Sequence, residues 1–216
     1  MSRAPDDRGP GILCVTDRLA LGGRAVQEAI RAAIAGGADM VQLREKDLRG
    51  GELLRLTREV VAAAKEAGGR CRVLLNDRLD VALAAKASGV HLPAQGLPLP
   101  AARRHAPKAF VIGRSVHSRT EARQAEREGA DYLLFGPVFA TPSKATFGPP
   151  HGPERLRKVV ESVRCPVWAI GGISPETIGD LRGIPLAGVA AITAIFGAAD
   201  PGEAVRELRS RLVASG

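Results

Sequence analysis

The sequence has few aromatic residues and no apolar run long enough to cross a bilayer. Aromatic side chains make up 3% of its 216 residues while 45% of the residues are hydrophobic, so the core must consist mainly of Ala, Val, Leu and Ile. The first ten residues lack the apolar stretch of a signal peptide. We therefore expect a globular protein with no membrane partner, and a disordered tail over residues 1–11.

Cysteines are also scarce. Cys14, Cys71 and Cys165 are far apart, odd in number and without a Cys-x-x-Cys pair, which argues against a disulfide framework. Each lies within or beside an apolar, strand-like run. This pattern predicts buried thiols and a cytoplasmic protein.

The formal net charge of +8 is not concentrated in any basic run. No Lys/Arg-rich segment is interleaved with aromatic residues, and many arginines fall on the polar faces of predicted helices. An arginine-rich, solvated surface on an enzyme for anionic substrates therefore explains the charge better than a nucleic-acid partner does.

Short apolar runs alternate with helix-period segments along the whole chain. Val26, Ile30 and Ile34, for example, share one face of the segment after the first run. Continuous apolar runs are typical of parallel strands that are covered on both faces. Eight strand–helix pairs predict an α/β fold, a single-domain TIM (β/α)8 barrel over residues 12–216, rather than an open doubly wound sheet. The predicted strands are 12–17, 40–45, 72–76, 89–92, 110–116, 132–139, 166–171 and 188–195.

Polar side chains cluster where these strands end, which is where barrel enzymes carry their catalytic groups. Arg44 and Lys46 lie two residues apart on the second predicted strand and should project to the same side. Asp77, next to Asn76, offers a carboxylate for Mg²⁺. These residues predict a diphosphate cradle, for which an Arg44–Glu45 ion pair is the purely structural alternative. Further donors from other strands are Ser115, Thr141, Ser143 and Lys144.

A second anion site is predicted after the seventh strand. Gly171 and Gly172 precede Ser174-Pro175, which has the pattern of a helix N-cap followed by proline at the first helical position. Loops at this place in a barrel often bind a monophosphate through backbone N–H groups. The irregular segment 140–152 follows the sixth strand and is expected to be a lid or a ligand-binding loop.

The four histidines are less specific. His91 and His117 lie near strand ends and are candidates for proton transfer, whereas His105 and His151 lie in polar segments where we expect solvent exposure. No pair has the spacing of metal ligands, and no Ser-His-Asp arrangement is evident.

Several short motifs at the predicted strands are specific when taken together. They are Val41-Gln42-Leu43-Arg44-Glu45-Lys46, Leu75-Asn76-Asp77-Arg78, Gly89-Val90-His91-Leu92, Ser115-Val116-His117, Gly129-Ala130-Asp131-Tyr132, Phe135-Gly136-Pro137-Val138-Phe139 and Ala169-Ile170-Gly171-Gly172-Ile173. With these motifs the chain resembles the thiamin phosphate synthase and TenI family from residue 12 to residue 213. The resemblance implies a TIM barrel that joins a hydroxymethylpyrimidine diphosphate to a thiazole phosphate and releases diphosphate. A pyrimidine-derived cation is implied to form as the diphosphate leaves with the help of Mg²⁺, and the thiazole nitrogen attacks that cation.

The resemblance also implies roles for single residues. Arg44, Ser115 and Lys144 are implied to be catalytic ligands of the diphosphate. Asp77 is the implied Mg²⁺ ligand, and Gln42 the implied pyrimidine contact. The further implied ligands are Lys46, Asn76, Thr141 and Ser143 for the diphosphate, and Gly171, Gly172, Ile192 and Thr193 for the thiazole phosphate.

Two departures from the family pattern leave alternatives open. The segment Pro93-Ala94-Gln95-Gly96 lacks the aspartate that usually supplies a second Mg²⁺ ligand, and Pro137 stands where a TenI-type thiazole tautomerase has its acid–base histidine. We favour the synthase, because water and substrate oxygens can replace a metal ligand, whereas a proton-transfer group is typically worth about 10²–10⁴-fold. The alternatives are the tautomerase and a catalytically silent binder of thiamin-pathway phosphates. A homodimer is expected from the resemblance alone.

Overall fold

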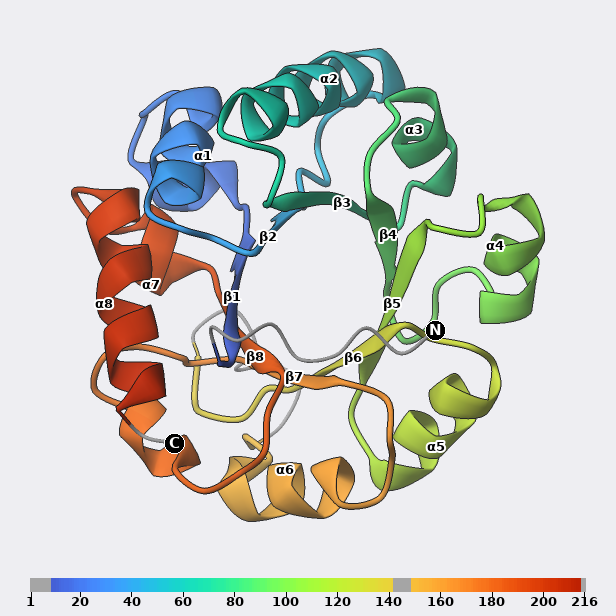
Figure 1. Ribbon diagram of the computed structural model, residues 1–216, viewed down its shortest axis with the longest axis vertical. Coiled ribbons are helices and arrows are strands. Elements are labelled where there is room, and N and C mark those ends of the chain that lie inside the picture. The colour runs from blue at the N-terminus through green and yellow to red at the C-terminus, as the bar shows by residue number, and fades with distance from the viewer. Residues whose placement is uncertain (1–8, 142–148, 215–216) are drawn as a thin grey trace.

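Parallel strands close into a barrel with the helices outside it in the computed structural model of the chain (Figure 1). The structure describes residues 9–141 and 149–214. Each strand pairs with the next in sequence, and the eighth returns to the first, with Gly11 opposite Gly188. The predicted α/β fold, a TIM barrel, is confirmed.

Strands and helices alternate along the chain. The strands are β1 (Gly11–Val15), β2 (Met40–Leu43), β3 (Arg72–Asn76), β4 (Gly89–Leu92), β5 (Val111–Val116), β6 (Tyr132–Phe135), β7 (Val167–Ile170) and β8 (Gly188–Ala191). The helices within the described ranges are α1 (Val26–Ala35), α2 (Gly50–Glu66), α3 (Leu79–Ala84), α4 (Leu99–His105), α5 (Arg119–Arg127), α6 (Gly152–Val160), α7 (Thr193–Phe196) and α8 (Pro201–Val213), with 3-10 helices η1 (Arg18–Leu21) and η3 (Ile178–Leu181). None of these helices is long and apolar enough to cross a membrane.

Four strands end at least two residues earlier than the apolar pattern predicts. β1, β2, β6 and β8 stop at Val15, Leu43, Phe135 and Ala191. Past these ends the backbone leaves the sheet: the amide of Arg44 donates to the Thr16 hydroxyl at 2.9 Å, and Pro137 has no N–H to offer. Several predicted site residues are therefore loop residues at the rim of the barrel.

The predicted α-helix after β7 is wrong. From Ser174 the chain makes turns and only the short helix η3 before β8 begins. The Ser174 hydroxyl accepts from the amide of Glu176 at 3.3 Å, which is a local turn rather than a helix cap. Gly179, Gly183 and Pro185 oppose a helix in this short connection.

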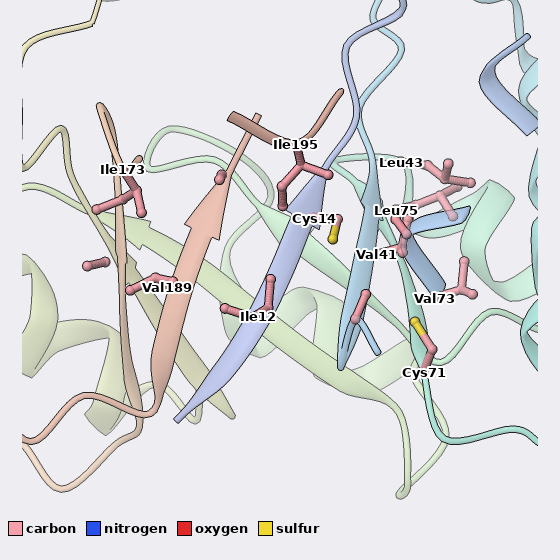
Figure 2. Packing of buried hydrophobic residues seen from close by; sticks show 14 of the residues in the cluster. Ile12, Cys14, Val41, Leu43, Cys71, Val73, Leu75, Ile173, Val189 and Ile195 are labelled. Carbon is pink, nitrogen blue, oxygen red and sulfur yellow. The ribbon is translucent and has the colours of Figure 1, made fainter. Parts of the chain in front are cut away.

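Side chains alternate along each strand between the barrel interior and the helical shell. Leu13, Met40 and Leu74 belong to an inner cluster. Ile12 and Cys14, which flank Leu13 on β1, belong to the large cluster between strands and helices (Figure 2). Because of this alternation, only every second residue of a strand can reach a ligand at the barrel mouth.

Trp168 on β7 fills the N-terminal part of the interior. The residue is only 8% exposed, and a Cβ added to Gly11 or Gly188 would come within 2.6 Å or 2.4 Å of its indole. The indole meets Tyr132 edge-on, with ring centroids 6.4 Å apart. Trp168 thus fills space that the two glycines at the starts of β1 and β8 leave open.

The three cysteines are free thiols. Cys14 and Cys71 are buried as predicted, while Cys165 is half-buried and its thiol donates to the carbonyl of Ala130. Burial raises the pKa of Cys71 and of Cys165 to about 12, so both remain protonated at neutral pH.

Candidate active site

Polar side chains form a continuous row at the inner carboxyl ends of β2 to β5. The register places Asn76 opposite His91. Gln42 Nε2 donates to Asn76 Oδ1 at 3.1 Å, and His91 Nε2 lies 2.8 Å from Ser115 Oγ. The predicted site residues Gln42, Asn76 and Ser115 therefore lie in one row, with His91 of β4 between Asn76 of β3 and Ser115 of β5.

The side-chain nitrogen of Gln42 has a hydrogen-bond partner, whereas its side-chain oxygen has none among the described residues. The residue is 2% exposed, and its Oε1 accepts no hydrogen bond from any described residue. A buried acceptor without a partner costs about 1–3 kcal/mol. An N–H group of a ligand would recover this energy, so the position suits a nitrogen heterocycle.

Glu45 pairs with Arg18 and not with Arg44, so the structural alternative for the Arg44–Glu45 pair is wrong. The carboxylate is buried, accepts from the Arg18 amide at 3.1 Å and lies 3.5 Å from Arg18 Nε. Burial raises the pKa of Glu45, against hydrogen bonds from Thr16 and Arg18 that lower it. Sequence reasoning missed Arg18, because only the folding of the β1–α1 loop onto β2 brings it here.

The guanidinium of Arg44 has no carboxylate partner among the described residues. The backbone of Arg44 is held by Thr16, while its half-buried side chain forms no ion pair within the described ranges. Lys46 is exposed. Both residues follow Leu43, the last residue of β2, so the strand alternation that predicted a shared side does not apply to them.

Asp77 supplies one carboxylate directly after β3. Its φ of +65° is in the left-handed region, which Asp tolerates better than most residues, and its amide donates to the carbonyl of His91 at 2.8 Å. The described residues contain no group of three or more His, Cys, Asp or Glu that could hold a metal ion. A single carboxylate nevertheless fits Mg²⁺ where phosphate oxygens and water complete its coordination shell.

Arg114 holds the loop that departs from the family pattern. Its buried guanidinium donates to the carbonyls of Pro93 at 2.6 Å and Leu97 at 2.7 Å. A Cβ on Gly96 in this loop would lie 3.1 Å from Asp77 Oδ1. Burial lowers the pKa of Arg114, and Asp77 is among the carboxylates that oppose the shift. The loop therefore reaches the candidate metal ligand, a role of Arg114 that no sequence pattern predicted.

Gly171 and Gly172 are required by both backbone conformation and packing. Their φ angles are +99° and +63°. A Cβ on Gly171 would meet Pro137 at 2.6 Å, and one on Gly172 would meet the carbonyl oxygen of Ala140 at 2.5 Å. The amides of Gly172 and Ile173 donate to no acceptor among the described residues, so both can serve an anion.

The other predicted ligands that the structure describes lie in a loop or next to a helix start. Thr193 is exposed and begins α7, and the half-buried Ile192 precedes it, so neither belongs to the eighth strand as predicted. Thr141 is half-buried after β6. Ser143 and Lys144 lie outside the residues that the structure describes.

The other histidines divide differently from the prediction. His117 Nδ1 lies 2.6 Å from the carbonyl oxygen of Gly136. His151 is half-buried against Phe135 and 6.2 Å from His117 between ring centroids, so the expected exposure of His151 is wrong. Burial lowers the pKa of His151. His105 is exposed at the end of α4, as predicted.

Thiamine-phosphate synthases are similar to this chain in both sequence and fold. A profile of the family described as thiamine monophosphate synthase matches residues 12–195. The thiamine-phosphate synthase of Moorella thermoacetica is 44% identical over 188 residues, 87% of this chain and 89% of the relative. That of Methanoculleus marisnigri is 42% identical over 207 residues, 96% of this chain and 97% of the relative. The solved thiamine phosphate pyrophosphorylase of Pyrococcus furiosus superposes with a TM-score of 0.86 at 36% identity, covering 97% of this chain and 99% of that one.

Proposed function

The chain belongs to the thiamine monophosphate synthase family, and we propose that it joins a hydroxymethylpyrimidine diphosphate to a thiazole phosphate, releasing diphosphate. The observation that supports this most is the row of Gln42, Asn76, His91 and Ser115, with Arg44 two residues after Gln42 at the end of β2. The row places a buried acceptor for a nitrogen heterocycle next to donors for an anion. A heterocycle that carries a diphosphate needs this combination.

The residues that bind the diphosphate promote cleavage of the carbon–oxygen bond between the diphosphate and the pyrimidine methylene carbon. As the carbon–oxygen bond to the leaving group lengthens, negative charge grows on the diphosphate and positive charge on the pyrimidine methylene carbon. Arg44 and Ser115 donate to the diphosphate, and Asn76 is free to donate because its oxygen already accepts from Gln42. These donors stabilise the departing anion more than the ground state, and the thiazole nitrogen then forms the new carbon–nitrogen bond. The resemblance assigns Lys144 to the same anion.

Mg²⁺ is part of this proposal, and Asp77 would hold it. When bound, the ion supplies positive charge against the diphosphate oxygens. One carboxylate matches a cation that takes most of its ligands from diphosphate and water. Asp77 is exposed at the end of β3, where its side chain can meet such a complex.

The thiazole phosphate fits the opposite side of the mouth. The amides of Gly172 and Ile173 are open after β7, and Thr193 follows β8 with an exposed side chain. β3 and β7 lie across the ring from each other (Figure 1). The two anions are therefore held by separate groups, with the reacting atoms between them.

Turnover of the two substrates, followed by diphosphate release, tests the proposal. Asp77→Ala should abolish coupling and leave thiazole phosphate binding, measured by calorimetry, nearly intact because the two sites share no ligand. Equal loss of both would refute the two-site arrangement. Isomerisation of a thiazole tautomer without coupling would identify the tautomerase, for which Pro137 offers no proton-transfer group. Binding of both substrates without turnover would identify a silent binder.

The proposed partners are these small phosphorylated substrates. A cytoplasmic location and a homodimer remain predictions. Cell fractionation and analytical ultracentrifugation would check them.

A further inference from the structure

His91 lies in the middle of a buried chain of three side chains. The residue is 1% exposed, its Nδ1 lies 2.8 Å from Tyr132 Oη, and its Nε2 lies 2.8 Å from Ser115 Oγ. Both ring nitrogens contact hydroxyl groups, and burial without a carboxylate partner in the described part of the chain favours the neutral form of the ring. A neutral imidazole donates through one nitrogen and accepts through the other. The two hydrogen bonds of His91 therefore run in the same direction, so that one neighbour donates to the ring and the other accepts from it.

The phenol of Tyr132 sets that direction. Tyr132 is 4% exposed, and no other polar group of the described residues contacts its oxygen. If His91 Nδ1 carried the hydrogen, the phenol hydrogen would be buried without an acceptor, which is unfavourable. A phenol is also more acidic than an alkyl alcohol and is the better donor of the two. Tyr132 therefore donates to Nδ1, and Nε2–H donates to Ser115 Oγ.

Gly113 makes this chain possible. The register runs from His91 to Gly113 on β5 and on to Tyr132 on β6. A Cβ on Gly113 would come within 2.1 Å of the Tyr132 ring and 2.6 Å of its oxygen, so the ring occupies the space that glycine leaves on β5. Trp168 packs edge-on against the same ring. The phenol is thus held in place by packing as well as by its hydrogen bond.

We propose that Tyr132 and His91 are positioning residues that fix the Ser115 hydroxyl as a donor. With its oxygen accepting from His91, Ser115 can give its own hydrogen only to another acceptor, which in the proposed function is the diphosphate. No proton is transferred along the chain; its effect is to orient one hydrogen before the ligand arrives. This inference rests on the proposed function, because Ser115 must meet the diphosphate for the orientation to matter.

The tautomer is the first test. In ¹⁵N spectra of the unliganded wild-type protein, His91 should be protonated at Nε2 and bare at Nδ1. A hydrogen on Nδ1 would overturn the proposal. This measurement uses the wild type, so it stands even if a variant fails to fold.

Variants then test the consequence for ligand binding, with inorganic diphosphate and Mg²⁺ as the probe. Tyr132→Phe keeps the ring in the Gly113 space but removes the donor, so Ser115 can turn its hydrogen toward Nε2. Diphosphate affinity should fall by about tenfold to a hundredfold, the usual range for one hydrogen bond to a charged group. In a Ser115→Ala background the same Tyr132→Phe change should have no further effect. Additive losses would mean that Tyr132 acts only through packing, and would overturn the proposal.

Two amide substitutions at His91 provide a matched pair. Glutamine places its amide near the position of Nε2 and can still donate to Ser115, whereas asparagine places it near Nδ1 and cannot. His91→Gln should retain most diphosphate affinity, and His91→Asn should lose as much as Ser115→Ala. Equal diphosphate affinities of the two variants would overturn the proposal that His91 orients the Ser115 hydroxyl. If Ser115→Ala itself binds diphosphate like the wild type, the diphosphate role of Ser115 in the proposed function fails, and this result is distinct from a failure of Tyr132→Phe alone.

Discussion

Replacing Gly96 with aspartate tests whether the β4–α4 loop can supply the carboxylate that this chain lacks. A Cβ on Gly96 would lie 3.1 Å from Asp77 Oδ1 and 2.9 Å from Pro93 Cδ, so the new side chain begins beside the candidate metal ligand. Arg114 fixes the loop through the carbonyls of Pro93 and Leu97. The new carboxylate should therefore stay close to Asp77.

Without Mg²⁺ the second carboxylate should destabilise the fold. Two unit charges at roughly 5 Å repel by about 1 kcal/mol in a water-like medium, the appropriate limit because Asp77 is exposed. This energy corresponds to a loss of about 2–4 °C in Tm for a chain of this size. The close approach to Pro93 adds a steric cost that any side chain would share. Gly96→Asn has nearly the same shape without the charge, so the difference between the two variants isolates the repulsion.

With Mg²⁺ the sign of the effect should reverse, because the ion attracts both carboxylates. Melting curves over a Mg²⁺ series should show the Tm of Gly96→Asp rising past that of Gly96→Asn. In steady-state kinetics the Mg²⁺ concentration for half-maximal rate should fall by about tenfold if the added ligand contributes about 1.4 kcal/mol. The reasoning is refuted if the two variants melt together at every Mg²⁺ concentration and share one Mg²⁺ dependence.

Other predictions concern the cradle and the barrel interior. Arg44→Ala and Lys144→Ala should each lower kcat by about 10²–10³-fold while Tm stays near the wild-type value, because a donor to the departing anion is removed; wild-type turnover in either variant would remove the cradle. Trp168→Ala should lower the free energy of unfolding by about 3–5 kcal/mol in urea titrations, because the indole fills the space above Gly11 and Gly188. A loss below about 1 kcal/mol would show that the interior collapses around the gap.

The barrel was predictable because each strand and helix has its own apolar period, and eight strand–helix pairs leave few other folds. Strand ends were not, since the apolar pattern runs on where the backbone has already left the sheet, as at Ile192 before α7. Gln42, Asn76 and Ser115 could be placed together from the sequence because all parallel strands end at one rim. Arg18 could not, because its contact with Glu45 depends on the path of a loop.

The glycines of the strands show why the hydrogen-bond direction of a site residue is harder to predict from the sequence than its position in the fold. Within a strand, glycine is read from the sequence as a weak point, since it packs no side chain. In this barrel the absence of a side chain at Gly113 leaves room for the Tyr132 ring, whose hydroxyl contacts His91. The absence of a side chain at Gly188 likewise leaves room for Trp168. The sequence pattern can therefore place Ser115 at the rim of β5. The direction of its hydroxyl hydrogen depends on Tyr132 of β6, which can contact His91 only because Gly113 on β5 has no side chain.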